Sequence, residues 1–143
     1  MKEILKYAIE HNASDIHITE NKIGWVRIKG ELEKYERRIS LDNIDEFIER
    51  DVPSVFPAYR DMRENRRINP IDGAFKFMDR RFRINIYLGM HGINIALRLL
   101  SDTILPLEEL FLPPEIELFA WIKSGLYLVV GTTGSGKVQR LLL

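Results

Sequence analysis

The sequence predicts an α+β domain followed by the opening helix, strand and loop of an α/β domain. An amphipathic helix pattern and strands of alternating polarity fill residues 1–100, and an apolar strand runs into a glycine-rich loop after residue 125. Alternating strands are typical of an antiparallel sheet with one solvated face, whereas apolar strands are typical of buried parallel sheets. We expect the first domain over 1–100, an interdomain linker over 101–112 and the start of the second domain over 113–143.

The composition excludes several classes of protein. The chain has 143 residues, of which 45% are hydrophobic and 29% charged, as is ordinary for a globular protein with a sizeable core. Lys+Arg and Asp+Glu both number 21, so the net charge gives no sign of attraction to nucleic acid or membrane. The absence of cysteine excludes disulfides and cysteine-ligated zinc, and no apolar run reaches transmembrane length. We therefore expect a cytoplasmic protein with no nucleic-acid partner and no transmembrane segment.

A helix, a strand and a hairpin are predicted at the start of the chain. Residues 15–19 alternate in polarity and predict a strand. Residues 23–29 and 31–37 predict two further strands, joined around Lys29 and Gly30. The helix precedes these strands, and its apolar face consists of Ile4, Leu5, Ala8 and Ile9.

Two helices are predicted next. Ser40 is a plausible N-cap for the first, and acidic residues in its first turns suit the helix dipole. Pro53 and Ser54 end this helix, and the second helix leads into a basic run over 60–67, which we expect to be a solvated face. The side chains expected to be buried are Leu41, Ile44, Phe47, Ile48, Val55, Phe56, Tyr59 and Met62.

The strongest strand pattern lies between residues 81 and 99. If Met90 and His91 form a two-residue loop, Gly89 pairs with Gly92 and the register of the two strands is fixed. That register pairs Ile86 with Ile95, Ile84 with Leu97, Phe82 with Leu99, and Arg83 with Arg98.

The pairing of Arg83 with Arg98 makes these two residues a candidate anion site. Like charges directly opposite each other on neighbouring strands are unfavourable unless an anion lies between or above them. The alternative is that each arginine is solvated or paired with an acid. A turn at Asp79 and Arg80 is expected to join this hairpin to a preceding strand.

Other side chains have a structural and a functional interpretation. Asp15 and His17 lie on one face of their predicted strand, where they could serve acid–base or metal chemistry. A structural or interdomain hydrogen-bonding role is the favoured alternative, because two residues do not make a metal site. The aromatic residues expected in the core, rather than on a ligand platform, are Trp25, Phe75 and Phe77.

A glycine-rich loop follows the apolar strand of 125–130. Residues 131–137 read Gly-Thr-Thr-Gly-Ser-Gly-Lys, which fits the phosphate-binding pattern Gly-x-x-x-x-Gly-Lys. The glycines allow the backbone N–H groups to approach a phosphate, and Lys137 can reach the outer phosphates. Val138 stands where this loop normally carries the Ser or Thr that holds Mg²⁺, so no metal ligand is expected. The alternative is an ordinary glycine-rich turn.

Together these segments resemble the type II/type IV secretion ATPases, most nearly their PilT-like pilus retraction motors. The matching segments follow the family's order and lie at 13–18, 27–30, 81–85, 96–99, 107–110, 112–113 and 125–137. The resemblance implies a PAS-like N-terminal domain, with an antiparallel sheet and flanking helices, joined to a RecA-like P-loop ATPase domain.

The resemblance also implies a function. Family members are expected to be homohexameric motors, peripheral to the inner membrane, that bind ATP and Mg²⁺ between their two domains. They couple hydrolysis to type IV pilus retraction (twitching motility) or related secretion through an inner-membrane platform protein. Arg83 and Arg98 match family positions that hold nucleotide phosphates. The implied nucleotide-binding residues are Gly131, Thr132, Thr133, Gly134, Ser135, Gly136, Lys137, Arg83 and Arg98.

The family's later ATPase motifs have no counterpart in this sequence. The acidic Walker B strand, the catalytic glutamate and the Asp- and His-rich boxes are missing, so no catalytic residue is assigned and little or no ATPase activity is expected. The tail at 138–141 is consistent with a frameshift, because codons for Val-Gln-Arg-Leu can be read two nucleotides later as Ser-Thr-Thr. We therefore expect a motor ATPase truncated after its P-loop. The alternative is a non-enzymatic PAS-like interaction or ligand-binding module with a vestigial P-loop. Nucleotide binding by this chain, and monomer versus non-native dimer, stay open.

Overall fold

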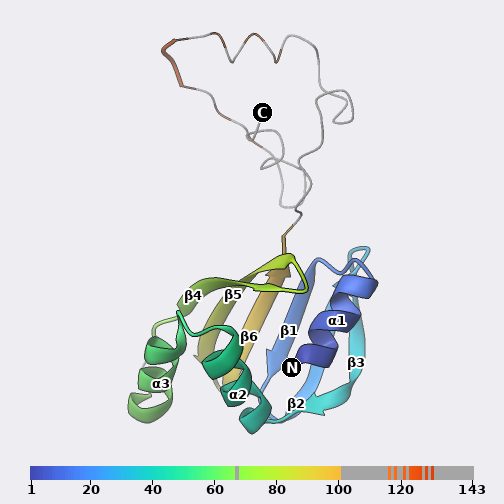
Figure 1. Ribbon diagram of the computed structural model, residues 1–143, viewed down its shortest axis with the longest axis vertical. Coiled ribbons are helices and arrows are strands. Elements are labelled where there is room, and N and C mark those ends of the chain that lie inside the picture. Colours follow the sequence, from blue (N-terminus) through green and yellow to red (C-terminus); the bar gives the residue numbers. More distant parts are fainter. Residues whose placement is uncertain are drawn as a thin grey trace. The chain divides into compact units, whose positions relative to one another are not determined.

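The computed structural model describes residues 1–66, 68–100, 116, 118, 121, 123–126, 128 and 130. The chain divides into two compact units, Met1–Asp102 and Thr103–Leu143. The helices and strands reported below all belong to the first unit, which is drawn in colour in Figure 1. The predicted linker and the predicted P-loop lie outside the described residues.

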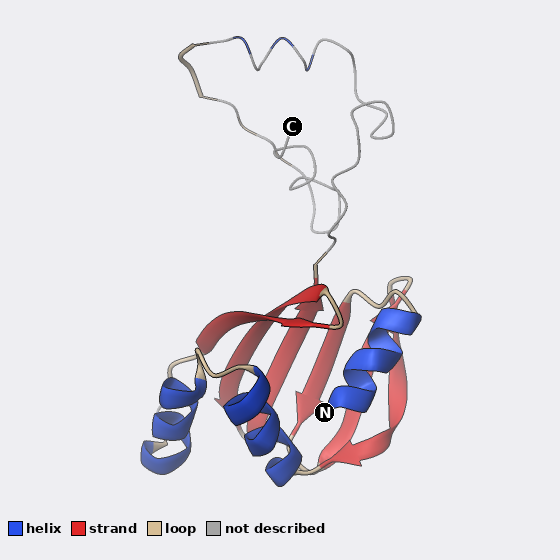
Figure 2. Cartoon of the chain, in the orientation of Figure 1, coloured by secondary structure: helices blue, strands red, loops and turns tan. Residues whose placement is uncertain are grey.

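The first unit is a mixed α+β fold built on a six-stranded antiparallel sheet. The strand order is β3-β2-β1-β6-β5-β4, and Figures 1 and 2 show the helices gathered on one face of the sheet. The elements in chain order are α1 (Lys2–Glu10), β1 (Asp15–Thr19), β2 (Lys22–Ile28), β3 (Glu31–Ile39), α2 (Leu41–Asp51), α3 (Phe56–Asn65), β4 (Ile71–Phe77), β5 (Arg80–Gly89) and β6 (Gly92–Leu99).

The hydrophobic core lies between the helices and the inner face of the sheet. Its central aromatic group joins three elements: the ring of Phe75 stacks on that of Phe82, with 5.2 Å between centroids, and meets Phe47 edge-on at 5.3 Å. Such pairs add to the free energy of burial. The predicted core position of Phe75 is confirmed, and Phe77 packs against the core while partly buried. The other predicted helix residues that are buried are Ile4, Leu5, Ala8, Ile44, Phe47, Ile48, Val55, Tyr59 and Met62.

The hairpin registers and the N-cap follow the sequence prediction closely. Gly89 pairs with Gly92, and all the predicted pairs of β5 with β6 are present. The β2–β3 turn uses Lys29 and Gly30 at φ values of 50° and 90°, the left-handed region that a two-residue hairpin loop requires. The Oγ of Ser40 accepts a hydrogen bond from the Asn43 N–H at 3.2 Å, as expected of an N-cap.

Two sequence predictions about single positions are wrong. The β4–β5 turn is formed by Met78 and Asp79, at φ values of 49° and 60°, and Arg80 already belongs to β5. The predicted turn was one residue too late. Trp25 is not in the core: 37% of its surface is exposed, because β2 alternates and its inner face is taken by Val26 and by Gly24.

The apolar strand predicted at 125–130 is not formed by the residues that the structure describes there. Leu126, Leu128 and Val130 are 82%, 74% and 83% exposed and have no strand geometry. Within the described ranges, no helix is long and apolar enough to span a membrane.

Candidate functional site

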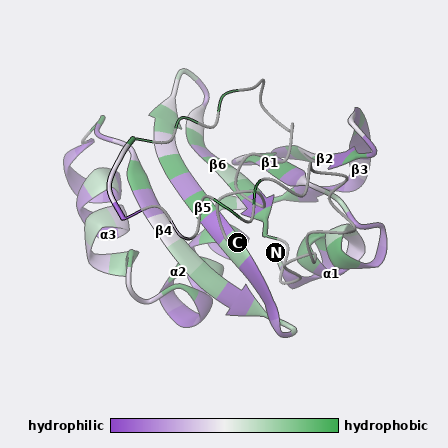
Figure 3. Ribbon diagram, turned by 90° about the horizontal axis from the view of Figure 1, so that it is seen from above, coloured by the Kyte–Doolittle hydropathy of each residue, from purple (hydrophilic) through white to green (hydrophobic). Residues whose placement is uncertain are grey.

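A row of charged residues crosses the open face of the sheet, the face opposite the helices. The row runs through Arg27 on β2, Asp15 on β1, Arg98 on β6 and Arg83 on β5. Each residue is directly opposite the next, so all their side chains leave the same face. Figure 3 shows the underlying pattern as hydrophilic and hydrophobic residues alternating along β5.

Asp15 is the anionic centre of this row. Its Oδ1 accepts a hydrogen bond from Arg98 Nε at 2.9 Å, and its Oδ2 accepts one from Ser14 Oγ at 2.8 Å. Arg27 Nε lies 3.6 Å from the same Oδ2. Partial burial raises the pKa of Asp15, but the hydrogen bonds from Arg98 and Ser14 and the charge of Arg98 outweigh burial and hold the pKa below its ordinary value. The carboxyl is therefore ionised at neutral pH.

Arg83 is held less firmly than Arg98. Its Nη2 is 3.7 Å from Asp72 Oδ1, and the two side chains are 67% and 60% exposed. Exposed ion pairs of this kind contribute little, because water screens them and two long side chains must be ordered. Arg98 has an exposed side chain too, at 59%, but its partner Asp15 is only 16% exposed.

The structure brings the two predicted anion-site arginines together. Arg83 is directly opposite Arg98, as the predicted register requires. The alternative interpretation also holds in part, because each arginine has an aspartate partner. Across the row, three arginines face two aspartates, Asp15 and Asp72, so one positive charge is in excess.

A second like-charge pair, which sequence reasoning missed, lies beside the first. Lys76 on β4 is directly opposite Arg81 on β5, and both side chains are exposed on the open face. Neither forms an ion pair with another residue in the described part of the chain. The misplaced turn hid this pair, because a loop at Asp79 and Arg80 would have set Lys76 opposite Arg83.

Asp15 and His17, for which acid–base or metal chemistry was the less favoured interpretation, lie on β1. The described residues contain no cluster of His, Asp or Glu suited to hold a metal ion. His17 is opposite Trp25 and Ala96. Asp15 instead has the hydrogen-bonding role that was the favoured alternative.

The nucleotide-binding residues expected at the P-loop, Gly131 through Lys137, and Val138 lie outside the described residues. Their predicted roles therefore stay predictions. Of the nine predicted nucleotide-binding residues, the described part of the chain contains Arg83 and Arg98.

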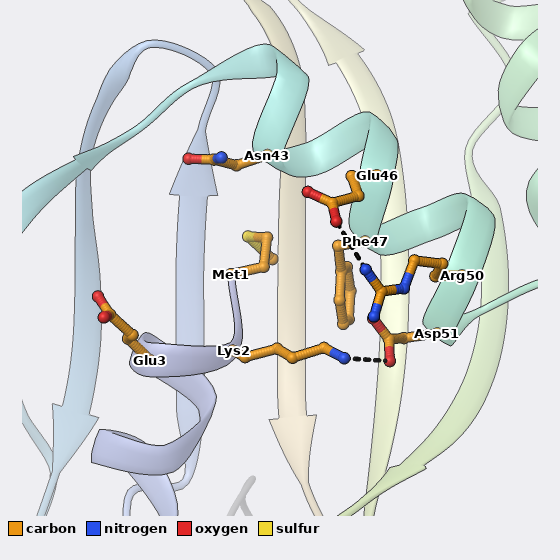
Figure 4. A pocket seen from close by; sticks show the side chains of 8 residues that line it. All are labelled: Met1, Lys2, Glu3, Asn43, Glu46, Phe47, Arg50 and Asp51. Atoms are coloured by element: carbon orange, nitrogen blue, oxygen red, sulfur yellow. Dashed lines mark hydrogen bonds and ion pairs between the residues drawn. The ribbon is translucent and has the colours of Figure 1, made fainter.

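A pocket on the helix-covered side of the unit is a weaker candidate. It has a volume of about 350 Å³ and lies between the start of α1 and one side of α2 (Figure 4). Its charges are already compensated, because Lys2 pairs with Asp51 at 2.9 Å and Arg50 with Glu46 at 2.8 Å. Burial lowers the pKa of the Met1 amine there. The pocket contains none of the predicted site residues.

No protein-family model matches the chain. The chain is 31% identical to the uncharacterized protein YggR of Escherichia coli K12, an alignment that covers 99% of this chain and 41% of that protein. It is 26% identical to the type IV pilus retraction ATPase PilT of Pseudomonas aeruginosa, over 97% of this chain and 40% of that protein.

The solved structures that the chain resembles are also ATPases. The pilus retraction motor PilT with bound ADP matches with a TM-score of 0.77 and 30% identity, over 99% of this chain and 41% of that one. The ATPase DotB of Legionella pneumophila matches with a TM-score of 0.65 and 27% identity, over 99% of this chain and 39% of that one.

The fold and these relatives define the class of the protein. The relatives of the chain are pilus and secretion ATPases, the class that its sequence motifs indicated. Among these relatives is the pilus retraction ATPase PilT. The chain spans about two fifths of the length of these relatives.

Proposed function

We propose that this chain is part of a motor ATPase for type IV pilus retraction or related secretion, in which Arg83 and Arg98 contact the phosphates of ATP. The observation that carries the proposal is the direct opposition of the two arginines on an open sheet face. Two opposed guanidinium groups cost free energy when alone. A phosphate group between them would replace that repulsion by charge-assisted hydrogen bonds.

In the whole motor, the first unit would be the PAS-like N-terminal domain, and the P-loop would open a RecA-like core. The motor would be a homohexamer that acts on an inner-membrane platform protein. Residues 131–137 would supply backbone N–H groups and Lys137 to the phosphates. The phosphates of ATP fit these residues, because backbone N–H groups and the Lys137 ammonium donate to anionic oxygens. The protein ligand that normally holds Mg²⁺ is absent, because Val138 stands where this loop usually carries Ser or Thr.

The proposal is tested by measuring ATP binding to the 143-residue chain calorimetrically, with and without Mg²⁺. We expect Lys137→Ala to abolish binding and the double variant Arg83→Gln/Arg98→Gln to weaken it at least about tenfold at low salt. Arg50→Gln is the matched control, because Arg50 is an exposed arginine on α2 with its own glutamate partner. We expect this control to bind ATP like the wild type.

Two outcomes contradict the proposal in different ways. Binding that needs Lys137 but survives loss of both arginines would confine the site to the P-loop. A folded chain that binds no ATP would favour the alternative, a non-enzymatic module that binds a partner or a different ligand. The described unit has its own sheet and core, which is what that alternative requires.

A further inference from the structure

We infer that Asp15 is a positioning residue for phosphate binding, which acts by holding the guanidinium of Arg98 in one orientation. The inference rests on the proposed function, since it assigns Arg98 to the phosphate site. It connects two segments that are 83 residues apart in the chain and that meet only because β1 pairs with β6.

The inference depends mainly on which nitrogen of Arg98 donates its hydrogen bond to Asp15. Arg98 donates to Asp15 through Nε, at 2.9 Å. A guanidinium has five N–H donors, and only one of them is on Nε. Within the described part of the chain, Arg98 forms its hydrogen bond and ion pair with Asp15 alone, so the four donors on its two Nη atoms remain for a ligand.

Asp15 is itself fixed. It belongs to β1, in the interior of the sheet, and pairs with Arg27 on one side and Arg98 on the other. Its second oxygen accepts the hydrogen bond from Ser14 Oγ. The backbone of Ser14 is anchored as well, because its N–H donates to Arg27 O at 2.9 Å and its carbonyl accepts from Leu99 N at 3.0 Å.

The two arginines of the site therefore differ in their freedom before a ligand arrives. A long side chain that becomes ordered on binding lowers the affinity, and a side chain already ordered does not. Arg98 is held by a carboxylate that is 16% exposed, whereas Arg83 has only a distant pair with the exposed Asp72. Asp15 thus orders the side chain of Arg98 before an anion binds. Among the described residues, no comparably buried carboxylate orders Arg83.

The charge of Asp15 opposes this effect, because a carboxylate repels phosphate. Replacing it by a neutral residue changes charge and orientation together. Asp15→Glu separates the two, since the charge stays and the carboxylate moves by one methylene. A purely electrostatic role predicts unchanged binding in this variant, and a positioning role predicts weaker binding.

The experiment measures binding of inorganic tripolyphosphate to the 143-residue chain by calorimetry. We expect Asp15→Glu to raise the Kd three- to tenfold in the wild type and in an Arg83→Gln background, and to have no effect in an Arg98→Gln background. Asp72→Glu is the matched control, because it makes the same change beside Arg83, and we expect less than a twofold effect. Wild-type affinity in Asp15→Glu, or an equal loss in the Arg98→Gln background, would overturn the inference.

A second measurement keeps the inference testable if the wild type binds no tripolyphosphate, a result that would count against the proposed function. The Nε–Hε signals of arginines can be followed by NMR. We expect the Arg98 signal to exchange with water at least fivefold more slowly than that of Arg83, and this protection to be lost in Asp15→Asn. Equal exchange at the two arginines would show that Asp15 does not hold Arg98. Should Asp15→Asn fail to fold, Ser14→Ala, which removes only the bond to Oδ2, is expected to reduce the protection about twofold.

Discussion

Lys76 and Arg81, directly opposite each other on β4 and β5, provide a quantitative test of the charge pattern on the open face. We predict that Lys76→Glu raises the free energy of unfolding. Opposed side chains have Cβ atoms about 5 Å apart, where two unit charges in water interact by about 0.8 kcal/mol. Flexible side chains separate further than this, so reversing one charge should stabilise the unit by about 0.5–1 kcal/mol.

The measurement is urea denaturation at low salt, because urea carries no charge that would screen the pair. In 1 M NaCl the Debye length falls to about 3 Å, and most of the gain should disappear. Lys76→Gln removes the repulsion without adding an attraction and should give about half the effect at low salt. A gain that is equal at both salt concentrations, or no gain at all, would refute the electrostatic reasoning.

Three further predictions concern the core and the site. Tyr59 is 2% exposed and donates a hydrogen bond to Asp45. Tyr59→Phe should therefore lower the free energy of unfolding, measured by urea denaturation, by about 1–2 kcal/mol. An unchanged free energy of unfolding would show that this hydrogen bond does not stabilise the unit. Gly24→Ala would place a Cβ 2.6 Å from Ile4 Cδ1, so it should lower the free energy of unfolding, measured by thermal denaturation, by about 1–2 kcal/mol. Adding Ile4→Val removes that methyl group and should recover part of the lost stability. Because the pKa of Asp15 is lowered in the folded unit, its stabilisation is complete above its unfolded pKa of about 4 and is lost as the pH falls through the folded value. Asp15→Asn should therefore destabilise the unit at neutral pH, and denaturation curves at pH 7 and pH 2 should show the difference shrinking in acid.

The sequence was most informative where local rules fix the geometry. The β5–β6 register follows from a two-residue loop and from alternation, and both are visible in the order of residues alone. The opposition of Arg83 and Arg98 could therefore be predicted. The turn before β5 was placed one residue too late, because Met78 adopts positive φ although it is not a residue that favours it.

The remaining features depend on which strands meet, and local rules do not decide this. The contact of Asp15 with Arg98 requires β1 to pair with β6, and nothing in either segment alone specifies that pairing. Trp25 was expected in the core, but the alternation of β2 places Val26 on the inner face and Trp25 on the other. The apolar run at 125–130 predicts a strand from composition alone, but its described residues have no strand geometry.

The strand order has a consequence for how the unit is assembled. Strands β1, β2 and β3 follow one another in the chain and form one half of the sheet, and β4, β5 and β6 form the other half. Within the sheet, the two halves are joined only along the seam between β1 and β6, and the bond from Arg98 to Asp15 crosses that seam. Arg83 and Arg98 both belong to the second half, and closing the seam places Asp15 beside Arg98. Because Asp15 is inferred to strengthen phosphate binding at Arg98, a phosphate group bound there would favour the joined halves over the separated ones. The ligand would then raise the free energy of unfolding of the unit.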